Sequence, residues 1–177
     1  WNISERFTDM SRIAYVNGAY VPMQTAAVSI DDRGFQFADG VYEVVTIRRG
    51  KMIDMDAHLA RLKRSLSELQ IAAPMSEGAF MHVLSETVRR NRASDALLYI
   101  QVTRGVAKRD HAFPLKGTRP SLMITCRSFN LNAVREKAKV GIKAITQPET
   151  RWSRCDIKST LLLPNVLAKQ AAKEAGG

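Results

Sequence analysis

The side chains best suited to chemistry in this sequence are the amine of Lys158, the guanidinium groups of Arg61 and Arg109, and the imidazole of His111. An amine attacks an aldehyde only when it is unprotonated, so a reactive lysine needs desolvation or a neighbouring cation to lower its pKa. Lys158 follows a tryptophan-containing loop in the string Cys155-Asp-Ile-Lys-Ser159. A lone lysine in a loop is usually solvated, so its surroundings decide between a nucleophile and a surface charge.

Arg109 and His111 are two positions apart, with Asp110 between them. An extended backbone puts side chains at this spacing on one face, where the two could grip one carboxylate together. A basic surface loop is the alternative interpretation. If the carboxylate of Asp110 points inward, its charge weakens such a trap.

Arg61 and His58 lie in a stretch whose leucines recur at steps of three and four, a pattern that predicts an amphipathic helix. The leucines are Leu59, Leu62, Leu66 and Leu69, and Asp56 is placed to cap the helix start. Arg61 falls off the leucine face, where its planar fork could donate two parallel hydrogen bonds to a phosphate. A solvated surface arginine is the common alternative.

Tyr42 lies in a predicted strand over residues 41–47, where side chains alternate between the two faces. Tyr42 and Val44 should therefore face one way and Glu43 the other. If Tyr42 faces a pocket, Val44 lines it. Glu43 is then expected to be structural and to pair with a nearby cation.

The elements that must position these residues follow from turn signals and periodicity. Asn17-Gly18 between two apolar runs predicts a hairpin, and a second hairpin is expected from residues 41–47 to 52–53. A helix should begin at the cap Ser76 and bury Phe80, Val83, Leu84 and Val88. With buried strands over 96–103 and 121–125, these elements predict one α+β domain.

A second unit is expected beyond an interdomain connection near residues 127–135. We predict a strand over 140–146, a loop over 147–157 and a helix over 161–175 with Pro164 in its first turn. One strand and one helix cannot bury their apolar faces, so the chain is expected to be cut off inside its second domain.

The predicted organisation thus has three parts. Residues 1–9 are a tag or upstream segment, residues 10–130 a small N-terminal α/β domain, and residues 131–177 the truncated start of a larger C-terminal domain that binds a cofactor.

The composition excludes several classes of protein. With 45% hydrophobic and 25% charged residues, the chain fits a globular fold and no disordered or collagenous one. The two cysteines lack a metal-ligand or redox spacing, which predicts no metal site and fits a reduced, cytoplasmic protein. The net charge of +10 raises a nucleic-acid-binding module as a rival, but the basic residues are scattered rather than gathered in one block.

Four separated strings carry a resemblance to a known family. They are Asp32 to Val45, His58 to Leu62, Gln101 to Gly105 with Arg109 to His111, and Arg151 to Ser159. In this order and spacing the sequence resembles the class IV (fold-type IV) aminotransferases, and among them most closely the bacterial D-amino-acid aminotransferases. The match runs from about Ile13 to Gly177 and implies pyridoxal 5'-phosphate as the cofactor.

The resemblance implies a role for each candidate residue. Lys158 would bind the cofactor covalently and shuttle a proton at the substrate α-carbon, and Arg61 would clamp the cofactor phosphate with His58 assisting or packing nearby. Arg109 and His111, with Tyr42, would receive the substrate α-carboxylate and so select the enantiomer. Branched-chain aminotransferases, aminodeoxychorismate lyases and R-selective amine transaminases generally lack this Arg-x-His arrangement.

The resemblance also implies partners and rivals. D-amino acids and 2-oxo acids are the expected substrates, a homodimer is the expected assembly, and neither nucleic acid nor membrane is an expected partner. In the family, the acidic partner of the pyridine nitrogen and the other phosphate ligands follow the segment that ends here at Gly177. A branched-chain L-aminotransferase, an aminodeoxychorismate lyase and an inactive fragment remain the alternatives.

Overall fold

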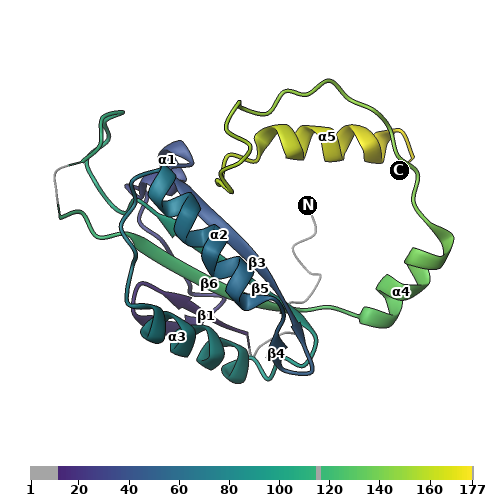
Figure 1. Cartoon of the computed structure of the whole chain (residues 1–177), viewed down its shortest axis with the longest axis horizontal. Helices are drawn as coiled ribbons and strands as arrows, with labels where there is room; N and C mark the ends of the chain where they lie inside the picture. Colours follow the sequence, from purple (N-terminus) through teal and green to yellow (C-terminus); the bar gives the residue numbers. More distant parts are fainter. Residues whose placement is uncertain (1–11, 115–116, 177) are drawn as a thin grey trace.

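A single antiparallel sheet forms the framework of the protein (Figure 1). The computed structural model describes residues 12–114 and 117–176. In that part of the chain the sheet has six strands in the order β2-β1-β6-β5-β3-β4. The strands are β1 (Ile13–Val16), β2 (Ala19–Pro22), β3 (Gly40–Arg48), β4 (Lys51–Met52), β5 (Ala96–Thr103) and β6 (Ser121–Ser128).

One face of this sheet carries the core. Alternate residues of β3 are buried, namely Val41, Glu43, Val45 and Ile47, and β5 and β6 alternate in the same way. Helices α2 (Met55–Glu68) and α3 (Glu77–Arg90) lie on one side of the sheet, α2 over β3 and α3 over β1 and β6 (Figure 1). Tyr42 and Val44 therefore belong to the opposite, partly exposed face, as the alternation predicts.

Both predicted hairpins and both predicted helices of the first unit are confirmed. Asn17 and Gly18 adopt positive φ angles in the turn that joins β1 to β2. Ser76 caps α3 by accepting a hydrogen bond from the Ala79 N–H. The cap predicted for α2 is wrong by two residues, because the helix begins directly after the β3–β4 hairpin and Asp54 rather than Asp56 is its N-cap.

A short helix, α1 (Arg33–Phe37), precedes β3 and was not predicted. Five residues are too few for an apolar period to emerge. The Asp32 carboxylate caps it by accepting a hydrogen bond from the Gly34 N–H at 2.8 Å.

The region after β6 differs from the prediction in two places. Helix α4 (Leu131–Val140) occupies the predicted interdomain connection, and residues 140–146 form no strand. Val140 and Ile142 are 90% and 87% exposed, and no strand in the described part of the chain lies beside them to accept their backbone hydrogen bonds. Helix α5 (Leu163–Glu174), with Pro164 in its first turn, is confirmed.

Neither α4 nor α5 contributes a buried residue, and the division of the chain near residue 130 stays a prediction. The predicted tag or upstream segment, residues 1–9, lies outside the described residues. Among the helices that the structure describes, none combines the length and apolarity needed to cross a lipid bilayer.

Candidate active site

The segment that carries Lys158 docks on the free edge at the start of β3. The Tyr42 N–H donates to the Lys158 carbonyl and the Thr160 N–H to the Gly40 carbonyl, both at 3.0 Å. Val41 and Ser159 thereby form an isolated antiparallel bridge. This pairing satisfies backbone groups that a strand edge otherwise leaves open. It also directs the Lys158 amine over the Tyr42 ring, with Nζ 4.3 Å from the ring centre.

Helix α2 holds the same segment from its other side. The Lys158 N–H donates to the Ser65 hydroxyl at 3.3 Å, and Ser65 is completely buried. Arg64 donates to the carboxylate of Asp156 and to its carbonyl oxygen. Arg154 also donates to Asp156, and these hydrogen bonds hold the pKa of the Asp156 carboxyl at about 2. Lys158 is therefore fixed between a strand and a helix although it lies in a loop.

Glu43 contacts both Arg61 and His58, the two residues predicted to bind the phosphate. Its carboxylate, 1% exposed, accepts hydrogen bonds from Arg61 Nε and Nη2 at 2.6 Å each and contacts His58 Nδ1 at 2.8 Å. Burial by itself raises the pKa of Glu43, but the hydrogen bonds from Arg61 and His58 outweigh it and lower the pKa below its ordinary value. Glu43 is thus the structural carboxylate that strand alternation predicts.

Part of the Arg61 guanidinium is solvent-exposed and can still donate hydrogen bonds. Its side chain is 45% exposed, and its Nη1 nitrogen has no hydrogen-bond partner among the described residues. Because Glu43 engages only Nε and Nη2, the outer edge of the planar fork can still donate to an anion.

Arg109 and His111 both pack against the ring of Phe37 in α1. The Arg109 Cζ lies 4.9 Å from the centre of the Phe37 ring, and the His111 ring lies 5.4 Å from it. Asp110 turns back into its own loop, where its carboxylate accepts a hydrogen bond from the Ala112 N–H. Its charge is therefore engaged in the loop rather than placed between the two basic side chains.

Three of the candidate residues, Lys158, Tyr42 and His111, line two neighbouring hollows. Lys158 and Tyr42 line one of about 220 Å³, and His111 lines the other, of about 370 Å³. The two hollows share Trp152, Ser159 and Leu161. Within the part of the chain that the structure describes, no hydrogen bond or ring contact joins Arg109 or His111 to Tyr42 or Lys158. One copy of the chain thus brings the amine and the tyrosine together and holds the arginine–histidine pair apart from them.

Tyr99 packs beside Tyr42 and was not predicted from the sequence. In β5 it lies opposite Val44, and its ring stacks on that of Tyr42 with the centres 5.6 Å apart. Its hydroxyl donates to the Gln101 side chain, and burial raises the pKa of Tyr99 above its ordinary value. The alternation of β5 holds the signal that would have found it, because Tyr99 belongs to the same face as Tyr42.

The comparisons with known proteins agree on one family. The family model for the amino-transferase class IV proteins matches residues 40–177. D-alanine aminotransferase from Bacillus licheniformis is 42% identical over 90% of this chain and 55% of its own length. D-alanine aminotransferase from Staphylococcus haemolyticus is 38% identical over 89% of this chain and 55% of its own length. The chain thus spans about half the length of the curated relatives it matches.

The branched-chain amino acid aminotransferase from Escherichia coli has a similar solved structure. The superposition covers 94% of this chain and 56% of the E. coli chain, with a TM-score of 0.76 and 18% sequence identity. At this identity the likeness concerns the fold alone, and it confirms the predicted mixed α/β fold class.

Proposed function

Because this chain belongs to the class IV aminotransferases, we propose that it carries out pyridoxal-phosphate-dependent transamination between D-amino acids and 2-oxo acids. The observation that carries the proposal is the placement of Lys158, whose backbone is hydrogen-bonded to the Tyr42 N–H on one side and to the Ser65 hydroxyl on the other, with its amine over the Tyr42 ring. A backbone fixed on both sides keeps the amine in one place, which suits a residue that must form and release a covalent bond repeatedly.

The residues present fit pyridoxal 5'-phosphate. Lys158 offers the amine, and the open edge of Arg61 offers donors to a phosphate, with Glu43 and His58 fixing the orientation of that guanidinium. When bound, the cofactor supplies an aldehyde carbon for the amine and a ring that withdraws electrons from the substrate.

The protein's own residues then have distinct tasks. With the cofactor bound, the Nζ of Lys158 would take the proton from the α-carbon of the amino donor in the first half of the exchange and would deliver a proton to the α-carbon of the 2-oxo acid in the second. Tyr42 forms the wall beneath this amine, and Val44 continues that wall along β3. Arg109 and His111 hold the substrate α-carboxylate, which selects the enantiomer presented to Lys158.

A homodimer is part of the proposal. In one copy His111 lines a different hollow from Lys158, and a second copy would allow the arginine–histidine loop to complete the site of its neighbour. We also assign the activity to the cytoplasm, since both Cys126 and Cys155 are free thiols.

Two observations support D-amino acids as the substrate class. The curated relatives at 42% and 38% identity are D-alanine aminotransferases. The chain also carries the Arg109-x-His111 pair that the branched-chain and lyase branches generally lack.

The proposal is tested by supplying the purified protein, loaded with pyridoxal phosphate, with one amino donor and no oxo acid. D-alanine should yield pyruvate in an amount equal to the active sites, because the exchange stops after its first half. L-alanine is the matched control and should yield none. Release of product only from L-leucine, or only from aminodeoxychorismate, would replace the proposal with one of the two rival chemistries.

A further inference from the structure

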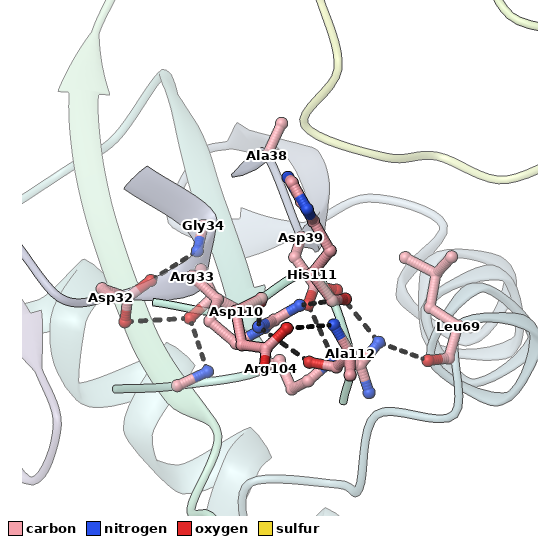
Figure 2. A network of polar contacts seen from close by, with 12 residues as sticks. Asp32, Arg33, Gly34, Ala38, Asp39, Leu69, Arg104, Asp110, His111 and Ala112 are labelled. Carbon is pink, nitrogen blue, oxygen red and sulfur yellow. Dashed lines mark hydrogen bonds and ion pairs between the residues drawn. The ribbon is translucent and has the colours of Figure 1, made fainter. Parts of the chain in front are cut away.

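A buried arginine of α1 holds the loop that carries Arg109 and His111. Arg33 is 3% exposed, and its guanidinium donates to three successive carbonyl oxygens of that loop (Figure 2). Nη1 donates to Asp110 at 2.6 Å and to Ala112 at 3.2 Å, and Nη2 donates to His111 at 3.4 Å. A planar fork with fixed donor directions can satisfy several carbonyls only if the backbone holds one shape.

Asp39 fixes the orientation of this guanidinium. Its carboxylate accepts from Arg33 Nε at 2.8 Å and from Arg104 Nε and Nη2 at 2.7 and 3.0 Å. Burial alone raises the pKa of Asp39, but the hydrogen bonds from Arg104 and Arg33 outweigh it and lower the pKa below its ordinary value. Arg104 in turn donates to the carbonyls of Leu69 and Gln70 at the end of α2. The network thus connects the loop to α1, β5 and α2.

The side chains of the loop rest on the same short helix as its backbone. Arg33 and Arg109 each have Cζ 4.9 Å from the centre of the Phe37 ring, and the His111 ring packs against it as well. Helix α1 therefore supports both the carbonyls and the basic groups of the loop.

We propose that Arg33 is a positioning residue that sets how tightly Arg109 and His111 bind the substrate carboxylate, an inference that rests on the proposed function. All three guanidinium nitrogens of Arg33 are engaged by Asp39 and the loop carbonyls. Arg33 acts through the backbone of the loop, whose shape determines whether the guanidinium of Arg109 and the imidazole of His111 converge on one anion.

The test is the Arg33→Lys variant of the cofactor-loaded protein. Lysine keeps the charge but replaces the fork with a compact ammonium, which cannot reach Asp39 and three carbonyls together. The KM for D-alanine and for 2-oxoglutarate should rise about tenfold or more, while kcat and the cofactor absorption spectrum stay close to those of the unsubstituted protein. The inhibition constant of propionate, which presents only a carboxylate, should rise in parallel.

A second measurement does not depend on catalysis. Hydrogen–deuterium exchange in the peptide covering residues 106–114 should be faster in Arg33→Lys, also without cofactor or substrate. Arg89→Lys, on the exposed side of α3, is the matched control and should change neither the exchange nor the KM. Should Arg33→Lys fail to fold, Asp39→Asn takes its place, since it removes the negative charge that fixes Arg33 Nε and should produce the same two shifts.

Two results would overturn the proposal while leaving the transaminase function intact. One is an active Arg33→Lys protein with unchanged KM and unchanged propionate inhibition. The other is a raised KM without faster exchange in the loop. An unsubstituted protein that releases no oxo acid from any amino donor would instead refute the proposed function, and this inference with it.

Discussion

Glu43 and Arg61 form a two-pronged ion pair with both N–O distances at 2.6 Å, in which the carboxylate is 1% exposed and the guanidinium 45%. The pair spans from the core face of β3 to the surface of α2. The buried partner is the anion, so loss of the Arg61 cation would leave an unpaired carboxylate in the core, whereas neutralising Glu43 leaves a half-exposed cation that water can solvate.

Glu43→Gln should destabilise the protein at pH 7. The amide keeps the shape but loses the charge that Arg61 and His58 contact, and we expect a loss of about 1 to 2 kcal/mol because Arg61 stays partly solvated. Urea unfolding measures the difference. Glu86→Gln, which interrupts the ion pairs of Glu86 with the more exposed Arg89 and Arg90 on α3, serves as the control and should cost less. Equal losses in the two variants would contradict the structural role of Glu43.

The same variant should change how stability depends on pH. The pKa of Glu43 is lower in the folded protein than its ordinary value of 4.5, so its stabilisation is complete above that value and is lost as the pH falls through the depressed pKa. The difference in unfolding free energy between the original protein and Glu43→Gln should be constant near neutrality and shrink below pH 4.5. A difference that instead grew on acidification would refute this account.

Tyr42 should act through both its ring and its hydroxyl, and two variants separate them. Tyr42→Phe keeps the aromatic face beneath the Lys158 amine, a contact of about 0.5 to 1 kcal/mol, so the covalent attachment of cofactor should be unchanged. Its KM for D-alanine should rise about tenfold if the hydroxyl contacts the substrate carboxylate. Tyr42→Leu should in addition weaken cofactor attachment. Identical behaviour of the two variants would show that the ring face contributes nothing.

Ser65 should stabilise the loop that carries Lys158. Ser65→Ala leaves the Lys158 N–H without its hydroxyl acceptor in a buried setting, at an expected cost of about 1 to 2 kcal/mol. Unfolding by urea gives the stability, and the rate of cofactor attachment tests the consequence for the site. Ser67→Ala, two residues along on the exposed face of α2, is the matched control and should be near neutral. If both serine variants behave alike, Ser65 does not position the lysine.

Signals carried by neighbouring residues explain why much of the fold could be predicted. The leucine spacing of α2, the Ser76 cap of α3 and the Asn17-Gly18 turn each record local structure in neighbouring residues. Residues 140–146 were predicted as a strand, and that prediction was wrong because strand formation also needs a partner.

The candidate residues could be predicted, but their supports could not. Strand alternation correctly separates Tyr42 from Glu43, and the helical period places Arg61 off the leucine face. Arg61 pairs with Glu43, and Arg33 reaches a loop 77 residues further along the chain. Both contacts are tertiary and leave no local pattern in the sequence. These contacts decide the geometry of the site.

The proposed transamination depends most directly on the Lys158 amine as the point of cofactor attachment. The purified protein is incubated with pyridoxal phosphate, reduced with borohydride, digested and analysed by mass spectrometry, with Lys158→Ala as the matched variant. We predict that the pyridoxyl mass is found on the peptide containing Lys158 and is lost in the variant. A label on another lysine, or none in a protein that has bound the cofactor, would contradict the account.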